Sequence, residues 1–207
     1  MAIDTIIFDF GGVLINLPDL AKFREWSDEL GVPYTAEMEQ VIRDFPNSPV
    51  FWDIMRGKVS EVNFWSQTAE RFEISHSLME QLLKLNTSPK NLNQPLLNVF
   101  SGLKGRYKLG ILSNASDSAR EIMIKLYHFD QFVDEIIISA EEGFAKPERE
   151  IYEIAVNRLD SKPETCLFVD DMIENILAAQ SFGMQTIHHT SNENTIALLS
   201  ERLNGKR

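Results

Sequence analysis

The sequence predicts an α/β fold in which a parallel sheet is interrupted, after its first strand, by a small helical bundle. Two patterns lead to this prediction. From about Pro95 onward, short apolar runs typical of strands alternate with segments typical of helices. The first strand-like run, at residues 5–10, is followed instead by a long stretch of mainly helical signals that lasts until residues 107–113. A parallel core with an inserted helical unit accounts for both patterns.

The core is expected to alternate strands with helices. The predicted strands lie at residues 5–10, 107–113, 135–139, 165–169 and 184–188. The predicted helices lie at residues 118–127, 147–159, 173–182 and 193–203. Pro147 suits the first position of a helix and Gly183 suits a helix stop. Strands that alternate with helices in this way form parallel sheets, because each crossover helix returns the chain to the same edge.

The inserted unit is expected to consist of several short helices. Its first apolar residues recur at near-helical spacing, at Leu20, Phe23, Trp26 and Leu30. Ser48 and Pro49 predict the start of a short helix that Gly57 can end, Ser60 can cap the next helix, and a further helix is expected at residues 77–85. We therefore predict a core of residues 1–15 and 91–207 and a helical bundle of residues 16–90.

The composition limits the classes of partner. With 207 residues, 43% of them hydrophobic, the chain can bury a sizeable core. Its formal net charge of -11, without clustered Lys and Arg, argues against a nucleic-acid partner. No apolar run approaches the roughly 18 residues of a membrane span, so we expect no membrane partner, a cytoplasmic location, and a monomer or homodimer. The single cysteine, Cys166, lies in an apolar run and is expected to be a core thiol.

Polar residues stand at the points where apolar runs stop. Asp9 follows the first run, Ser113 and Asn114 follow the second, and the adjacent acids Asp170 and Asp171 follow a later one. A lysine that precedes a predicted helix, Lys146, completes the series. An open parallel sheet binds ligands at the carboxyl ends of its strands, so these groups are expected to converge on one edge. Together they predict a phosphoryl-transfer site.

Four segments carry these residues: FDFGGVL with Asp9, LSNAS with Ser113, FAKPE with Lys146, and FVDD with Asp170 and Asp171. In this order they resemble the four motifs of the haloacid dehalogenase superfamily, over nearly the whole chain. The resemblance implies a Rossmann-like three-layer core with a mobile helical cap inserted after the first strand. Within the superfamily, the chain looks most like bacterial sugar-phosphatase relatives that include the α-D-glucose-1-phosphate phosphatases.

The resemblance also implies roles for the residues. Asp9 would be the nucleophile that forms an aspartyl-phosphate, which water then hydrolyses. Ser113 would donate its hydroxyl to a phosphate oxygen, and Lys146 would neutralise charge on Asp9 and the phosphoryl group. The remaining phosphate contacts would come from Gly11, Gly12 and Asn114.

A magnesium ion is the cofactor that the resemblance implies, with ligands from Asp9, the main-chain oxygen of Gly11, Asp170 and Asp171. Mg²⁺ prefers oxygen ligands. Two adjacent acids at the end of a buried strand would repel one another without a cation. An acidic chain that binds a phosphorylated small molecule must also cancel charge locally. Which of Asp170 and Asp171 binds the ion directly stays open.

One position departs from the family pattern. Phosphatases of this superfamily usually carry a second Asp two positions after the nucleophile, as acid and base, and here that position is Gly11. A positioned acid or base is worth about 10² to 10⁴ in rate, so a slower or more selective enzyme is expected. The absence of this acid should matter least for leaving groups that depart easily, which favours sugar 1-phosphates as substrates. Asp19 could substitute as base, although a helix N-cap is the more ordinary role for it.

The helical insert is expected to supply specificity by closing over the site. Its candidate substrate contacts are Arg43, Arg56, Lys58 and Arg71, each of which also suits a solvated helix surface. The aromatic pairs 51–52 and 64–65 predict the core of the bundle, with a sugar-stacking platform or a dimer face as the alternative. The histidines are expected to be structural or exposed: His76, His128, His188 and His189.

Two other functions stay open. A 2-haloacid dehalogenase shares the fold and the Asp nucleophile and lacks the second Asp, but it needs no metal, so the pair Asp170 and Asp171 argues against it. A phosphate-binding pseudoenzyme that lost turnover with Gly11 would bind Mg²⁺ and phosphate without releasing product. A response-regulator receiver uses similar residues, but the helical insert makes the chain too long for one.

Overall fold

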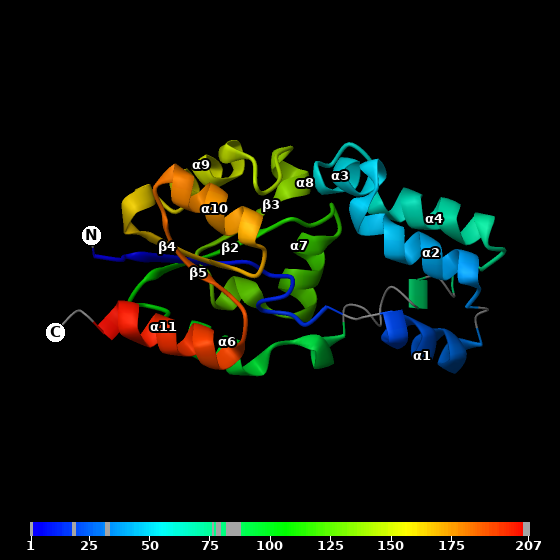
Figure 1. The fold of residues 1–207 in the computed structure, drawn as a ribbon, viewed down its shortest axis with the longest axis horizontal. Coiled ribbons are helices and arrows are strands. Elements are labelled where there is room, and N and C mark those ends of the chain that lie inside the picture. The colour runs from blue at the N-terminus through cyan, green and yellow to red at the C-terminus, as the bar shows by residue number, and fades with distance from the viewer. Residues whose placement is uncertain are drawn as a thin grey trace.

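A parallel sheet forms the centre of the protein, whose computed structural model describes residues 2–17, 20–31, 34–75, 77, 80–81 and 88–204. Its strand order is β3-β2-β1-β4-β5, and every neighbouring pair is parallel (Figure 1). The strands are β1 (Thr5–Phe8), β2 (Lys108–Ser113), β3 (Glu135–Ile138), β4 (Cys166–Asp170) and β5 (Gln185–His188). The predicted parallel α/β fold is confirmed.

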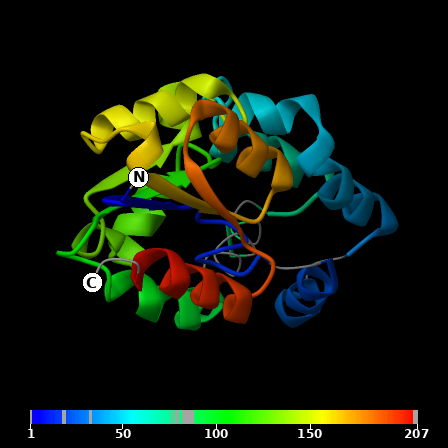
Figure 2. The same ribbon diagram turned by 60° about the vertical axis from the view of Figure 1, so that its left-hand side comes forward.

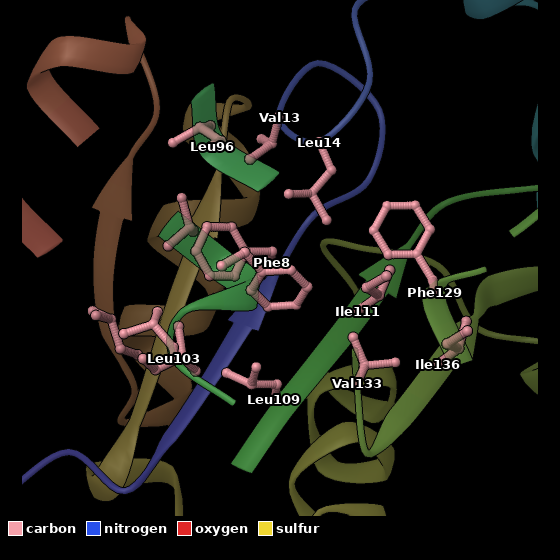
Figure 3. Packing of buried hydrophobic residues seen from close by; sticks show 14 of the residues in the cluster. Phe8, Val13, Leu14, Leu96, Leu103, Leu109, Ile111, Phe129, Val133 and Ile136 are labelled. Carbon is pink, nitrogen blue, oxygen red and sulfur yellow. The ribbon is translucent and has the colours of Figure 1, made fainter. Parts of the chain in front are cut away.

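Both faces of the sheet are buried, which is why its strands read as continuous apolar runs rather than alternating ones. In β1, Ile6 and Phe8 belong to the core on one face, whereas Ile7 between them belongs to the core on the other. Figure 3 shows Phe8 in the larger of these cores, with Leu109 and Ile111 of β2 continuing the layer. The ring of Phe8 packs on Phe100, with ring centroids 4.6 Å apart.

Helices cover the two faces and give the three layers that the sequence predicts. Figures 1 and 2 show α6 and α11 on one face and α9 and α10 on the other. Their bounds are α6 (Gln94–Ser101), α9 (Arg149–Arg158), α10 (Ile173–Phe182) and α11 (Asn192–Asn204). Short segments connect them: η2 (Pro89–Asn91), α7 (Ala119–Glu121), η3 (Ile122–Leu126), η4 (Phe129–Gln131), α8 (Ser139–Glu142) and η5 (Pro163–Thr165).

Between β1 and α6 the chain forms a set of helices that we call the helical group: α1 (Leu20–Leu30), α2 (Ala36–Asp44), η1 (Phe45–Asn47), α3 (Pro49–Met55) and α4 (Glu61–Arg71). It lies on the side of the sheet toward which β1 runs (Figure 1). The Ser48 hydroxyl accepts a hydrogen bond from Phe51 N, so this serine caps α3 as predicted. The predicted division at residues 16–90 stays a prediction.

Aromatic and apolar side chains hold the helical group together. A small core contains Trp26, Met38, Ala69 and Ile74. The ring of Phe45 stacks on Phe64 at 4.8 Å and contacts Phe51 at 5.4 Å and Trp65 at 5.3 Å between centroids. These rings are only half-buried. The predicted aromatic pairs therefore do pack within the group, but less deeply than the apolar residues of the sheet.

The structure differs from the predicted elements in several places. Helix α9 begins at Arg149, so Pro147 precedes the helix rather than opening it, and the Ser60 side chain makes no capping hydrogen bond to α4. The first strand ends at Phe8 rather than residue 10, because the chain turns after Asp9. The helix predicted at residues 118–127 is one α-helical turn followed by a wider π-helical segment, in which β-branched Ile122 and Ile124 lower α-helical propensity. Of the helix predicted at residues 77–85, the structure describes Ser77, Glu80 and Gln81, which are helical; the other positions lie outside the described residues.

Among the described residues, no helix combines the length and the apolar character needed to cross a bilayer.

Candidate active site

Asp9 stands where the central strand ends. Its N–H still bonds to Val169 O of β4 at 2.8 Å, but its side chain turns back and accepts a hydrogen bond from Phe10 N at 2.6 Å through Oδ1. In the sheet register, Phe8 lies opposite Ile111 of β2 and Val169 of β4. The residues that follow these three positions therefore meet at one edge, and they include Ser113 and Asp170.

Lys146 brings two of the predicted acids together. Its side chain is 1% exposed, and its Nζ lies 2.8 Å from Asp9 Oδ1 and 2.7 Å from Asp170 Oδ2. Burial lowers the pKa of the Lys146 ammonium group, but the carboxylates of Asp9 and Asp170 outweigh burial and raise it above its usual value. The lysine is therefore a fixed positive charge between the two acids.

Asn114 holds the backbone of this lysine. Its Nδ2 donates to Lys146 O at 2.8 Å, and Lys146 N donates to Asn114 Oδ1 at 2.7 Å. The amide thus uses its oxygen and one of its two N–H groups in this pair, and a phosphate contact from Asn114 stays a prediction. No local pattern in the sequence indicates this pair, because the two residues are 32 positions apart.

Ser113 is the last residue of β2 and is 3% exposed. It sits on the strand next to β1, one residue beyond the level of Asp9 in the register. Its side chain is buried at the edge of the sheet where Asp9 and Asp170 also lie, and its contact with a phosphate oxygen stays a prediction. The sequence prediction placed it at this edge.

Asp170 is fully buried and is oriented by three donors. Asn175 Nδ2 lies 3.0 Å from its Oδ1 and 3.1 Å from its Oδ2, and Met172 N donates to Oδ1 at 2.8 Å. Asn175 is itself buried in the first turn of α10. Sequence analysis missed this asparagine; its signal was a polar residue at a buried position of a helix that starts just after two acids.

Asp171 is half-buried, and its backbone is fixed by a histidine. His188 Nε2 lies 2.9 Å from Asp171 O. Because a carbonyl oxygen can only accept, this ring nitrogen must carry the proton. His189 Nδ1 bonds to Thr195 Oγ1 at 2.8 Å, and burial lowers the pKa of its ring. Both histidines hold structure, as predicted; His76 lies outside the described residues.

The acids fit a divalent metal ion. One ligand atom from each of Asp9, Asp170 and Asp171 lies within 4.8 Å of the others. Three carboxylates face one ammonium group, so two negative charges stay uncompensated. Burial raises the pKa of Asp9 to about 7, with Lys146 opposing and Asp170 adding to the rise; burial and Asp170 also raise the pKa of Asp171. A hard dication with oxygen ligands matches both the donors and the missing charge.

The two glycines after Asp9 differ in what they require. Gly12 has φ of +76°, which favours glycine, and a Cβ there would lie 2.4 Å from Asp171 Oδ2, so a side chain would have to displace this carboxylate. Its N–H donates to Ile15 O at 2.9 Å, and a phosphate contact through this N–H would need that bond to open. A Cβ at Gly11 would meet only Leu17 Cδ2, at 3.7 Å, which is ordinary contact. Sterics therefore favour glycine at residue 12 and not at residue 11.

The cationic residues predicted to contact substrate are paired with carboxylates instead. Within the helical group, three of them form exposed ion pairs, Arg43 with Glu39, Lys58 with Asp53, and Arg71 with Glu37. Arg56 differs, because its Nη2 lies 2.7 Å from Glu148 Oε1 at the start of α9. Asp19, the candidate substitute base, lies outside the described residues.

The helical group contacts the core at loops that follow the strands. Glu148, the partner of Arg56, also accepts a hydrogen bond from Ala145 N at 2.6 Å, next to Lys146. Gly57 approaches the backbone of α8 so closely that a Cβ would lie 2.1 Å from Ala140 O. Glu61, the first residue of α4, accepts hydrogen bonds from the hydroxyls of Ser116 and Ser118, in the loop after β2. Each contact thus lies a few residues from a predicted site residue.

Cys166 is fully buried in β4, and burial raises the pKa of its thiol to about 12. It is a core residue on the face opposite Phe8, in agreement with the sequence.

Comparison with known proteins gives a family and several relatives. The family model described as haloacid dehalogenase-like hydrolase matches residues 3–183. Bifunctional epoxide hydrolase 2 of Mus musculus is 27% identical over 213 residues, which cover 92% of this chain but only 37% of that protein. A phosphorylated carbohydrates phosphatase of Thermotoga maritima is 26% identical, covering 89% of this chain and 84% of that protein. A D-ribitol-5-phosphate phosphatase of Bacteroides thetaiotaomicron is 24% identical, covering 89% and 90%.

Solved structures share the fold. A wild-type enzyme of the haloacid dehalogenase family from Bacteroides thetaiotaomicron, in complex with magnesium and inorganic phosphate, superposes with a TM-score of 0.75. The alignment covers 95% of this chain and 99% of that one, at 21% identity. At this identity the likeness concerns the fold, and it agrees with the three-layer arrangement described above.

Proposed function

This chain belongs to the haloacid dehalogenase-like hydrolases, and from that premise we propose that it is a Mg²⁺-dependent phosphomonoester hydrolase acting through an aspartyl-phosphate on Asp9. The observation that carries the proposal is the charge arrangement at the sheet edge. A buried lysine joins Asp9 to Asp170, and the three acids together still lack two positive charges. A phosphate-transfer site with a dication uses all of these groups.

In the proposed reaction the Asp9 carboxylate attacks phosphorus in line with the leaving oxygen. Its Oδ1 already accepts a hydrogen bond from Phe10 N and pairs with Lys146, so we assign the attack to Oδ2. A bond forms between Oδ2 and phosphorus, and the bond from phosphorus to the leaving oxygen breaks. Water then attacks phosphorus, releasing inorganic phosphate and restoring the carboxylate.

The surrounding residues stabilise charge during these steps. Lys146 opposes the effect of burial and so favours the ionised form of Asp9, and it neutralises charge on the phosphoryl group, where a buried ammonium is more effective than a solvated one. Ser113 donates its hydroxyl to a phosphate oxygen. Asn114 keeps the backbone of Lys146 in place through its two hydrogen bonds and is therefore a positioning residue.

We propose Asp9, the main-chain oxygen of Gly11, Asp170 and Asp171 as the ligands for Mg²⁺. When bound, the ion supplies positive charge that offsets the acids and the phosphoryl oxygens. Asn175 and His188 fix the two acids of the pair, through the carboxylate of Asp170 and the backbone of Asp171. Ligands that are oriented in this way hold a metal more tightly than mobile ones.

We propose further that residues 16–90 act as a cap over the core of residues 1–15 and 91–207. Its contacts with the loops near Ser113 and Lys146 support this assignment, because they link the position of the helices to the site. Cytoplasmic location and the choice between monomer and homodimer stay predictions.

For the substrate we propose phosphorylated small metabolites, with sugar 1-phosphates preferred. The argument rests on Gly11, which offers no acid to protonate a poor leaving group, so substrates with easily departing oxygens should lose least. The names of two relatives, a phosphorylated carbohydrates phosphatase and a D-ribitol-5-phosphate phosphatase, support sugar phosphates as a class. The second of these acts on an alkyl phosphate, so the preference for 1-phosphates needs a direct test.

The test is phosphate release from an aryl phosphate, sugar 1-phosphates and sugar 6-phosphates, with Mg²⁺ and with a chelator. We expect turnover that requires Mg²⁺ and is lost in Asp9→Asn. The matched control is Asp160→Asn, whose side chain is fully exposed and whose positive φ of 44° suits asparagine. Equal turnover of 6-phosphates and 1-phosphates would refute the leaving-group argument. Metal-independent release of halide from 2-haloacids would support the dehalogenase, and phosphate binding without turnover the pseudoenzyme.

A further inference from the structure

The loop that follows Asp9 is held in place by a distant segment of the chain. Residues 91–93, which lead from the helical group into α6, run beside residues 14–16 of this loop. Asn16 N donates to Asn91 O at 2.7 Å, and Asn93 N donates to Leu14 O at 2.9 Å. The loop that carries Gly11 and Gly12 therefore depends on contacts some 80 positions away in sequence.

Asn93 adds its side chain to this support. It is 5% exposed, and its Nδ2 donates both to Val13 O at 2.7 Å and to Asn192 Oδ1 at 2.8 Å. Asn192, the first residue of α11, returns a bond from its own Nδ2 to Asn93 Oδ1 at 3.0 Å. Asn93 thus donates to two consecutive carbonyl groups of the loop, those of Val13 and Leu14. Asn192 in turn holds the side-chain amide of Asn93.

The orientation of the amide follows from its partners. Turning Asn93 by half a rotation about χ2 would bring its oxygen against Val13 O and Asn192 Oδ1, both of which can only accept. Three buried or half-buried polar groups would then lack donors, which is unfavourable. The pair therefore has one arrangement, with the donor of Asn93 directed at the loop.

The loop transmits this support to the acids. Val13 and Leu14 are fully buried and anchor the loop in the core near Leu96 (Figure 3). Gly12, next to Val13, lies so close to the Asp171 carboxylate that a Cβ on it would come within 2.4 Å of Oδ2. A shift of Val13 would therefore move Gly12 relative to the Asp171 carboxylate.

We propose that Asn93, locked by Asn192, is a positioning residue that holds residues 11–14 in the arrangement needed to bind Mg²⁺ and phosphate. The inference rests on the proposed function. A buried asparagine pair with a purely structural role would lower the stability of the fold and leave binding unchanged. A positioning role alters binding in protein that is still folded.

The experiment measures Mg²⁺ binding, and then inorganic phosphate binding in saturating Mg²⁺, by titration calorimetry. We expect Asn93→Ala to weaken both affinities about tenfold, the equivalent of one well-placed hydrogen bond. Asn192→Ala leaves the bond to Val13 intact, so its effect should be smaller, about two- to threefold. Hydrogen exchange of the amides in residues 10–16 should be faster in Asn93→Ala than in the unaltered protein.

Two controls separate positioning from stability. Val133→Ala removes buried methyl groups from the same core but lies far from the loop, so it should lower the melting temperature without changing either affinity. Asn98→Ala removes an exposed asparagine of α6 and should change neither. If Asn93→Ala fails to fold, Asn192→Ala carries the test.

Unchanged affinities in folded Asn93→Ala or Asn192→Ala, with only a lower melting temperature, would overturn the proposal. The unaltered protein distinguishes this result from failure of the proposed function. If it bound neither Mg²⁺ nor phosphate and released no phosphate, the proposed function would fall. If the unaltered protein bound Mg²⁺ and phosphate and the variants bound them equally well, only the proposed role of Asn93 would be refuted.

Discussion

The sheet edge and the helical group hold their charges in different ways. At the sheet edge, Lys146 is 1% exposed and Asp170 fully buried, and their ion pair is 2.7 Å long. In the helical group, Arg43 and Arg71 form pairs of the same length, but their side chains are 55% and 61% exposed. Water and salt screen exposed pairs, which contribute little, whereas buried charges interact strongly. This difference in burial indicates that the strongly interacting charges lie at the edge of the parallel sheet.

The helical group contributes in another way, through contacts at its junction with the core. Arg56, Gly57 and Glu61 lie within a few residues of one another and reach three different loops of the core. Their partners follow β2, β3 or the turn that carries Lys146. Changes at the sheet edge should therefore have large effects, changes at the junction intermediate effects, and changes within the helical group small ones.

The largest effect is expected from Lys146→Met, compared with Arg71→Ala. Loss of the lysine leaves Asp9 and Asp170 buried without a counter-charge, which costs about 3–5 kcal/mol of unfolding free energy, and should lower kcat by about 10³ or more. Arg71→Ala should cost about 0.5 kcal/mol and leave kcat unchanged. Urea unfolding and steady-state kinetics measure both. If the two variants lost similar amounts of stability and kcat, burial would not explain the difference between the sheet edge and the helical group.

The two glycines of the loop provide a sharper contrast within the sheet edge. Gly12→Ala places a methyl group where Asp171 lies and should weaken Mg²⁺ binding and turnover about a hundredfold. A Cβ at residue 11 makes only ordinary contacts, and Gly11→Asp should raise turnover of sugar 6-phosphates by about 10², because it restores an acid. Gly11→Ala, which fits but adds no acid, is the control. An equal gain from Gly11→Ala would refute the role of the acid.

The uncompensated acids predict how pH affects the metal-free protein. Burial raises the folded-state pKa of Asp9 from 3.8 to about 7, so the stability from this group is fully present below about pH 4 and is lost as the pH rises through 7. Mg²⁺ should reverse this loss, and its stabilisation should be about 2 kcal/mol larger at pH 8 than at pH 5, or about 4–8 °C in Tm. Thermal unfolding with Mg²⁺ and with chelator measures it. If Mg²⁺ raised the stability by the same amount at both pH values, this would argue against the proposed acidic ligands.

An intermediate effect, smaller than those at the sheet edge, is expected at the junction. Arg56→Gln removes the ion pair to Glu148 but leaves the bond from Ala145 to that carboxylate. We expect kcat/KM to fall about two- to fivefold, the equivalent of a partly exposed ion pair. The same change at Lys58, Lys58→Gln, is the control, because its partner Asp53 lies within the helical group. A loss as large as that of Lys146→Met would mean that Arg56 contacts substrate directly.

The sequence alone predicted the sheet and the residues at its edge, because the relevant signals are local. Asp9, Ser113 and Asp170 each stand directly after an apolar run, and parallel strands carry such residues to one edge whatever the strand order. The haloacid dehalogenase motifs then selected Lys146, whose local sequence otherwise suits a loop. The strand order itself was not predicted, since it depends on how distant segments pair.

The supporting contacts were missed because the residues that make them are distant in sequence. Asn114 bonds to Lys146, and Asn93 bonds to Val13 and Asn192, across 32, 80 and 99 positions. An asparagine in a loop is ordinary in composition, and only its burial and its partners reveal a role. Likewise, the close approach of Gly12 to the Asp171 side chain could not be seen in the sequence, and the phosphate contact expected of Gly12 stays a prediction. Arg43 and Arg71 lie on the exposed surface of the helical group in ion pairs, which agrees with the solvated-surface alternative for them.

The central claim, a covalent phosphate on Asp9, can be tested by rapid quench of the enzyme with a labelled sugar 1-phosphate in Mg²⁺. We predict label on the protein that hydroxylamine releases, as it does from acyl phosphates, and that peptide mapping assigns to Asp9. Because Gly11 provides no base for the water step, the labelled form should accumulate, and Gly11→Asp should shorten its lifetime. Phosphate release without any labelled protein, or with label at another residue, would contradict the mechanism.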